Sequence, residues 1–164
     1  MELWPLACLA VLAIGLTALS VIDFRTGYLP DPLQVALALI GIGVCLYGSP
    51  IGITWELAVL GAVINGGLFW GLRRIVSKLK KRDAMGIGDI KLVAVGGIWV
   101  GPLALPYIMA AGGILTLLGA GFASWITGKP VWKGEMPLGP GLAAGILGVF
   151  TAALFNLPWL NLTI

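Results

Sequence analysis

Long apolar stretches, separated by short segments that contain glycine, proline or charged residues, dominate the chain. A helix that crosses a membrane needs about 20 apolar residues, and most of these stretches approach that length, although the second and fourth are shorter. The pattern therefore predicts an all-α, polytopic membrane bundle of about six transmembrane helices. The predicted helices are Leu3–Ile22, Leu33–Tyr47, Trp55–Leu72, Ile90–Leu103, Leu105–Ile126 and Leu138–Leu157.

The apolar stretches contain pairs of glycines four positions apart. On a helix such pairs form a flat strip that lets a neighbouring backbone approach closely. We expect close helix packing at Gly67-x-x-x-Gly71, Gly97-x-x-x-Gly101 and Gly141-x-x-x-Gly145.

The composition is that of a chain surrounded by lipid. Of the 164 residues, 59% are apolar and only 10% are charged, and the mean hydropathy is +1.03. A soluble domain of this size needs more polar surface. We expect a single membrane-embedded domain over residues 1–164, without a separate soluble domain. Cys8 and Cys45 lie inside apolar stretches without CxxC spacing, so they are predicted to be small core residues.

All ten Lys and Arg residues lie in or beside the first, third and fifth connections between the stretches. Cytoplasmic loops of membrane proteins are enriched in Lys and Arg, which predicts that these connections are cytoplasmic and that both termini face the other side. The longest basic run, Arg73–Asp83, is interpreted as a topology signal that also attracts anionic lipid headgroups. Membrane lipids are therefore expected partners, whereas nucleic-acid binding is disfavoured.

Two aspartates lie at the same predicted membrane face. Asp23 ends the first apolar stretch and Asp89 immediately precedes the fourth. Ionisable groups at the rim of a membrane bundle are costly and mark functional sites. Two carboxyl groups within hydrogen-bond reach share one proton, so that one activates water while the other donates to a peptide carbonyl. The chain contains no His, and this chemistry requires neither a metal nor an organic cofactor.

A structural role competes with a functional one at both aspartates. Asp89 suits the first turn of a helix, where a carboxylate accepts hydrogen bonds from free N–H groups. Gly86 and Gly88, however, allow backbone conformations and close approaches that a cap does not need. Asp23 is predicted at a helix C-terminus, where the dipole disfavours negative charge, so a functional role is favoured.

Two neighbouring charges are assigned differently. Asp31, followed by Pro32, is interpreted as the cap of the second helix, with the proline as its first residue. Lys91 follows Asp89 by two positions, so on a regular helix it points away from Asp89.

Three segments carry a family resemblance: Asp23 followed by Gly27-Tyr28-Leu29-Pro30-Asp31, then Gly86-Ile87-Gly88-Asp89-Ile90-Lys91-Leu92, then Met136-Pro137-Leu138-Gly139-Pro140. Together they resemble the motifs of the type IV prepilin leader peptidases, a branch of the membrane-embedded aspartic proteases that have a GxGD motif. The resemblance covers most of the chain, and the combination is far more specific than GxGD alone.

The resemblance implies that Asp23 and Asp89 are the catalytic pair. It implies that the substrates are prepilins or pseudopilins of a type IV pilus or type II secretion system, cut after a short basic leader. The site would face the cytoplasm from the inner membrane. The residues that it implies shape the site are Gly86, Gly88, Lys91, Pro30, Pro137, Gly139 and Pro140.

The sequence departs from the family pattern at several points. Asp31 replaces the more usual Asn and Leu138 the usual Phe, which affects the expected fit of the substrate rather than catalysis. The segment with paired CxxC motifs, which longer bacterial members carry for N-methylation, is not seen in these residues. We therefore expect peptidase activity without methyltransferase activity.

Other functions remain open at this level. A presenilin-like protease is disfavoured, since a Pro-Ala-Leu motif near the last stretch is missing. A small transporter or proton-pathway protein also carries acids within its bundle, but there they lie near the membrane midplane. An inactive scaffold for pilin assembly is the third alternative, and the oligomeric state is left open.

Overall fold

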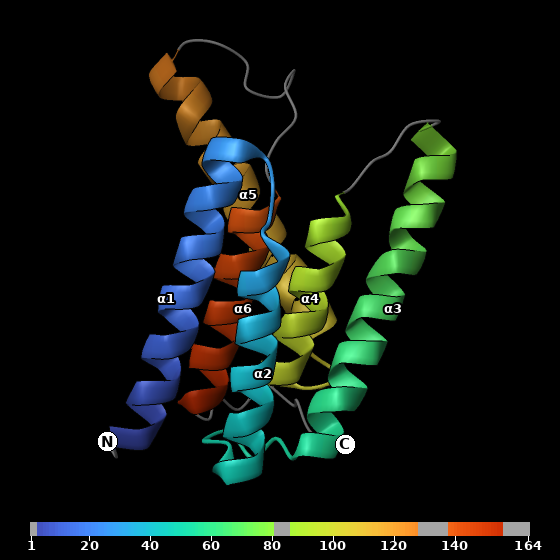
Figure 1. The fold of residues 1–164 in the computed structure, drawn as a ribbon. Helices are drawn as coiled ribbons and strands as arrows, with labels where there is room; N and C mark the ends of the chain where they lie inside the picture. The colour runs from blue at the N-terminus through green and yellow to red at the C-terminus, as the bar shows by residue number, and fades with distance from the viewer. Residues whose placement is uncertain (1–2, 81–85, 128–137, 156–164) are drawn as a thin grey trace.

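The computed structural model describes residues 3–80, 86–127 and 138–155 as an all-helical bundle (Figure 1). This confirms the predicted fold class. Helices α1, α2, α3 and α5 are long and apolar enough to cross a membrane, whereas α4 and α6 are shorter, with 14 and 16 residues. The chain is a multi-pass membrane protein. The helices are α1 (Leu3–Thr26), α2 (Asp31–Gly48), α3 (Trp55–Lys80), α4 (Ile87–Val100), α5 (Leu105–Thr127) and α6 (Gly139–Leu154).

Several helices extend beyond the apolar stretches that predicted them. Helix α3 continues to Lys80 through much of the basic run that was predicted to separate two helices. Hydropathy ends near Leu72, but Lys, Arg and Leu are good helix formers, so the helix does not end there. Helix α1 continues to Thr26, where Gly27 at φ 64° follows it and donates its N–H to the Asp23 carbonyl at 2.8 Å. Asp23 therefore lies inside the last turn of α1.

Helix α4 is the most enclosed element. It packs against α2, α3 and α6, and nine of its 14 residues are buried. The Trp99 indole N–H donates to the Leu37 carbonyl of α2 at 3.0 Å, and the ring meets Phe150 of α6 edge-on at 5.8 Å between centroids. At the end of α4, the side-chain amide of Asn65 from α3 donates to the Gly101 carbonyl at 3.0 Å. Helix α4 is thereby held from three sides.

Glycines bring two pairs of helices into backbone contact. Gly61 of α3 lies directly against Gly97 of α4, and a methyl group on Gly61 would lie 3.0 Å from the carbonyl carbon of Gly101. The predicted strip at Gly97 and Gly101 is therefore a packing surface.

The same holds between α5 and α6. A methyl group on Gly145 would lie 2.6 Å from the Ile108 carbonyl oxygen, and one on Gly141 would lie 2.7 Å from that of Gly112. The predicted strip at Gly67 and Gly71 is wrong as a packing contact, since nothing in the described structure lies within 4 Å of either added methyl.

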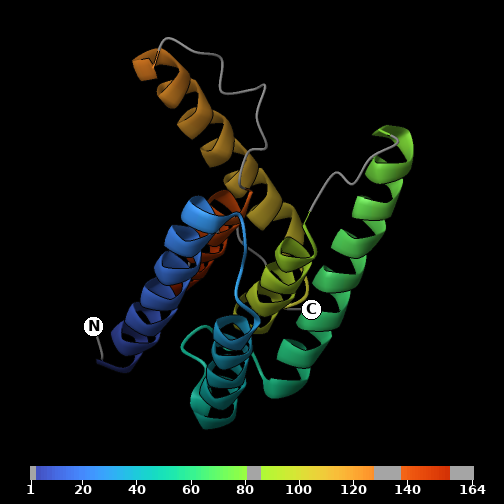
Figure 2. The same ribbon diagram turned by 45° about the horizontal axis from the view of Figure 1, so that its top comes forward.

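The helix ends that carry the two aspartates meet at one end of the bundle. The ends of α1, α3 and α5 and the beginnings of α2, α4 and α6 lie at the upper end in Figure 1. Toward this end α3 and α5 diverge from each other, which Figure 2 shows from a second direction. The last turn of α1 and the first turns of α4 and α6 therefore lie toward the same end of the bundle (Figure 1).

Replacing Gly61 with Ala is expected to destabilise the bundle by about 1–3 kcal/mol. The added methyl would lie 2.9 Å from the Gly97 carbonyl carbon, and backbone atoms cannot turn aside as a flexible side chain would. Gly67→Ala on the same helix is the matched control, because its methyl meets open space. That variant is expected to be neutral or to gain up to about 1 kcal/mol in helix propensity. Thermal unfolding of the detergent-solubilised variants measures the difference. Equal melting temperatures for the two variants would contradict the packing of α3 on α4.

Candidate active site

Asp23 is buried in the last turn of α1, with 7% of its surface exposed. The backbone N–H of Gly139, the first residue of α6, interacts with its carboxyl group. The approach is close, since a methyl group on Gly139 would lie 2.9 Å from the Asp23 carboxyl carbon. The Oδ2 atom of Asp23 has no hydrogen-bond partner among the described residues. Asp23 therefore offers a buried, unused acceptor.

Asp89 is the third residue of α4 and is also buried, at 8% exposed. Its Oδ2 accepts a hydrogen bond of 3.3 Å from the N–H of Gly86, which precedes the helix. This is half of the reciprocal contact found at many helix starts, and Gly86 has no side chain to supply the other half. The expected capping role of Asp89 is thus partly realised.

Gly86 and Gly88 have ordinary backbone angles, and what distinguishes them is the absence of a side chain. Gly86 has φ −68° and ψ 149°, a conformation open to any residue, and Gly88 is helical. A methyl group on Gly88, however, would lie 3.0 Å from the Leu29 side chain. The expectation of special backbone conformations is therefore wrong, while the expectation of close approach holds for Gly88.

The two carboxyl groups come from different helices and interact electrostatically with each other. Both are shielded from solvent, so charge on one disfavours charge on the other. Two such groups retain a single proton between them over a range of pH. The fold therefore brings Asp23 of α1 and Asp89 of α4 close enough to influence each other's charge, which makes them a candidate acid and base.

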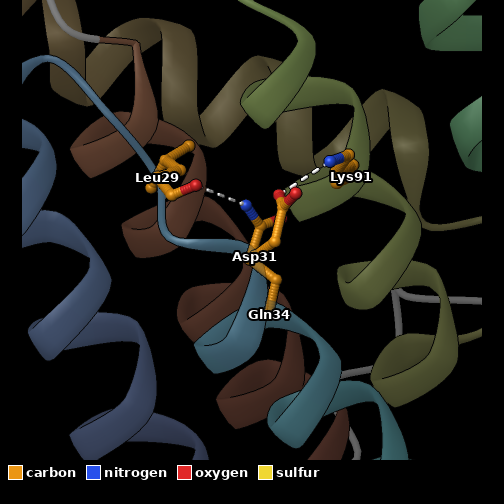
Figure 3. A network of polar contacts seen from close by, with 4 residues as sticks. All are labelled: Leu29, Asp31, Gln34 and Lys91. Carbon is orange, nitrogen blue, oxygen red and sulfur yellow. Dashed lines mark hydrogen bonds and ion pairs between the residues drawn. The ribbon is translucent and has the colours of Figure 1, made fainter.

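The charged residues next to the pair form a separate contact. The Lys91 ammonium lies 2.7 Å from Asp31 Oδ1, which joins the first turns of α4 and α2 (Figure 3). The predicted capping role of Asp31 is wrong. Pro30 occupies the cap position, and Asp31 is the first helical residue, so its carboxylate turns to the Lys91 cation instead. Lys91 does point away from Asp89, as expected.

Of the remaining predicted site residues, one contacts a candidate catalytic aspartate and another lies in a neighbouring groove. Gly139 contacts Asp23, as described above. Pro140 lines a groove of about 660 Å³ between α1 and α6, together with Ser20 and Phe24 of α1. Neither Asp23 nor Asp89 lines this groove. Pro137 lies outside the described residues. Within those residues there is no cluster of three or more His, Cys, Asp or Glu side chains that could hold a metal ion.

Sequence reasoning missed Gln34. Its side chain is 2% exposed, and its amide N–H donates to the Leu29 carbonyl at 3.4 Å, just before α2 begins (Figure 3). A signal was present, because a lone amide within an apolar stretch is costly in a membrane and needs a partner inside the protein.

Both aspartates lie in a part of the chain that is similar to a known protein family. The family model described as "Type IV leader peptidase family" matches residues 10–126. The chain is 34% identical over 134 residues to a "Prepilin leader peptidase/N-methyltransferase" of Burkholderia pseudomallei, covering 82% of this chain and 42% of that protein. It is 32% identical over 153 residues to a "Type 4 prepilin-like proteins leader peptide-processing enzyme" of Escherichia coli, covering 93% of this chain and 54% of that protein.

A third relative, the "Prepilin leader peptidase/N-methyltransferase" of Escherichia coli strain K12, is 39% identical over 106 residues. The chain spans about half the length of these curated relatives. No solved structure matches the chain. The resemblance predicted from the sequence motifs is confirmed by these matches. The chain belongs to the type IV leader peptidase family.

Proposed function

We propose that the protein is a membrane aspartic endopeptidase that removes short basic leader peptides from type IV prepilins or pseudopilins. The observation that carries this proposal is the meeting of Asp23 and Asp89, buried and mutually interacting, in a chain of this family. The relatives are named for processing prepilin leader peptides, which supplies the substrate class. The names of the Burkholderia pseudomallei and Escherichia coli K12 relatives also include N-methyltransferase, whereas the activity that we propose for this chain is the peptidase alone.

The mechanism uses the two carboxyl groups in different protonation states. The ionised carboxylate takes a proton from a water molecule, and the resulting hydroxide attacks the peptide carbonyl carbon while the protonated carboxyl donates to the carbonyl oxygen. As the tetrahedral intermediate collapses and the C–N bond breaks, the carboxyl group that took the proton from water gives it to the leaving amine. The proton on the former carbonyl oxygen returns to the other carboxylate, which restores the pair. The unpartnered Oδ2 of Asp23 is the acceptor that a catalytic water would use.

Small residues let neighbouring side chains come close at this point. Gly139 lies directly against the Asp23 carboxyl, and Gly88 lies against the Leu29 side chain. Helix α3, which carries Arg73, Arg74 and Lys78, lies on the far side of α2 and α4 from α1 (Figure 2). Since exposed charges interact weakly beyond about 10 Å in physiological salt, this separation reduces their repulsion of a basic leader near Asp23.

The proposed orientation follows from the distribution of the basic residues. The site faces the cytoplasm from the inner membrane, and both termini lie on the other side. Residues 1–164 form one membrane-embedded peptidase domain in this proposal. The scissile bond would then lie at the cytoplasmic edge of the membrane, directly before the apolar helix of the prepilin.

Asp23→Asn and Asp89→Asn are each expected to lower prepilin cleavage by about 10³-fold or more, because each removes one member of the acid–base pair while preserving its shape. Cleavage of a prepilin by the purified protein in detergent or liposomes measures the rates. Glu56→Gln, an exposed carboxylate at the start of α3, is the control and should be fully active. Cleavage that survives either Asp substitution would exclude the paired mechanism. A folded wild-type protein that leaves prepilins intact would favour the transporter or scaffold alternatives.

Gly139→Ala is expected to lower the cleavage rate by about 10-fold or more, because the added methyl would push the Asp23 carboxyl out of position. Gly148→Ala on the same helix is the matched control, since nothing lies within 4 Å of its added methyl. Single-turnover cleavage rates and melting temperatures of both variants make the test. If Gly139→Ala cleaves at the wild-type rate, the contact between α6 and Asp23 has no part in catalysis.

The orientation is tested by cysteine labelling in a background in which Cys8 and Cys45 are replaced by Ala. Lys78→Cys, near the end of α3, should react with a membrane-impermeant maleimide only after the inner membrane is permeabilised. Thr54→Cys, just before α3, should react in intact spheroplasts, and both positions are exposed. The opposite labelling pattern would place the site on the outer face.

A further inference from the structure

The first turn of α4 has a single apolar contact with the core, made by the partly buried Ile90. Gly86 and Ile87 are exposed, and apart from Asp89 the buried residues of α4 begin only at Leu92. A short helix that begins in this way frays easily at its end. The position of Asp89 therefore depends on whatever fixes this turn from outside.

Helix α2 and the connection before it supply two such contacts. The Asp31 carboxylate pairs with Lys91 at 2.7 Å, and the Leu29 side chain, itself 4% exposed, packs against Gly88 (Figure 3). Leu29 is fixed in turn, because its carbonyl accepts the amide hydrogen bond from the buried Gln34. The two contacts thus fall on either side of Asp89 in the sequence.

Their spacing on the helix is informative. Gly88 and Lys91 are three positions apart, so they lie on one face of α4, the face toward the start of α2. Asp89 is rotated by about 100° from Gly88, so it lies off that face, and its carboxyl group interacts electrostatically with Asp23 of α1. The contacts with α2 therefore do not touch the carboxyl group of Asp89, and they act on it only by fixing the turn that carries it.

The ion pair itself is half exposed, with 47% and 51% of the two side chains accessible. Pairs of this kind contribute little to overall stability. The ion pair matters because it fixes the helix turn that carries Asp89. Displacement of a catalytic group by about 1 Å lowers the reaction rate by as much as 100-fold.

We propose that Asp31 and Lys91 are positioning residues, whose ion pair fixes the first turn of α4 so that Asp89 stays aligned with Asp23. This inference rests on the proposed peptidase function for its kinetic consequence. Its structural consequence, a fixed distance between the starts of α2 and α4, is independent of that function.

The kinetic test uses single and paired substitutions. Asp31→Asn and Lys91→Gln should each lower kcat for prepilin cleavage by about 10-fold, with KM changed by less than about twofold. The charge reversal Asp31→Lys with Lys91→Asp should recover most of the lost kcat, because the pair is restored with opposite polarity. Lys78→Gln and Glu56→Gln remove one exposed charge of each sign elsewhere and should leave kcat unchanged.

The structural test does not require catalysis. Spin labels on Tyr28→Cys and Ile87→Cys, two exposed positions beside the contact, report the distance across it in the background without Cys8 and Cys45. The distance distribution should be narrow in that background, broader after Lys91→Gln, and narrow again in the charge reversal. The melting temperature should change little throughout, in contrast to a variant that weakens the whole bundle.

Each outcome decides the inference. Unchanged distances in the single variants would overturn it, as would losses that appear in KM alone, because these would mark Asp31 or Lys91 as substrate contacts. Failure of the charge reversal to recover either readout would also overturn it. If the wild-type protein cleaves no prepilin, the proposed function fails, and the spin-label distances alone decide whether the ion pair fixes α4.

Discussion

The enclosure of α4 between α2, α3 and α6 is the constraint on which the rest of the structure depends. The helix is short, and its central and C-terminal turns are held by three contacts. These are the backbone contact with Gly61 of α3, the hydrogen bond from the Asn65 amide of α3, and the hydrogen bond from the Trp99 indole to α2. In lipid there is no hydrophobic gain from bringing apolar helices together, so close packing and interhelical hydrogen bonds must supply the attraction. These contacts fix the level at which α4 begins, and hence the level at which Asp89 meets Asp23.

The enclosed region contains polar groups that the protein does not fully satisfy. The side chains of Asp23, Gln34 and Asn65 each keep one buried oxygen without a partner among the described residues. The side-chain amide N–H of Gln34 donates to a carbonyl just before α2, and that of Asn65 donates to a carbonyl at the end of α4. In both residues the unpaired oxygen is a consequence of the hydrogen bond that the amide nitrogen makes. At Asp23 the carboxyl group interacts with the Gly139 N–H of α6, and Oδ2 still has no partner among the described residues. Its unused acceptor is best explained as an acceptor kept for water or substrate.

The sequence predicted the fold class and the family, because hydropathy and motif spacing can be read locally along the chain. It also predicted that Asp23 and Asp89 lie at the same end of the bundle, where the structure has them buried in neighbouring helix ends. It did not predict where helices end beyond the membrane, since α3 continues to Lys80 on helix propensity after its hydropathy has fallen. It also assigned a packing role to Gly67 and Gly71, which face open space, and missed Gly61. Glycine spacing marks a surface that permits close approach, but only the arrangement of neighbouring helices determines which of these surfaces is covered.

The departure at Asp31 shows how a residue can be judged by its partner rather than by its motif. As a substitute for the usual Asn, it suggested altered fit to the substrate. In the structure its carboxylate is engaged by Lys91, which lies two residues beyond Asp89. An amide at this position would keep a hydrogen bond to the ammonium but lose the attraction of opposite charges, which is the longer-ranged part of the interaction. The aspartate therefore strengthens a contact within the protein. Under the proposed function, it bears on the alignment of Asp23 and Asp89 before it bears on the fit of a prepilin.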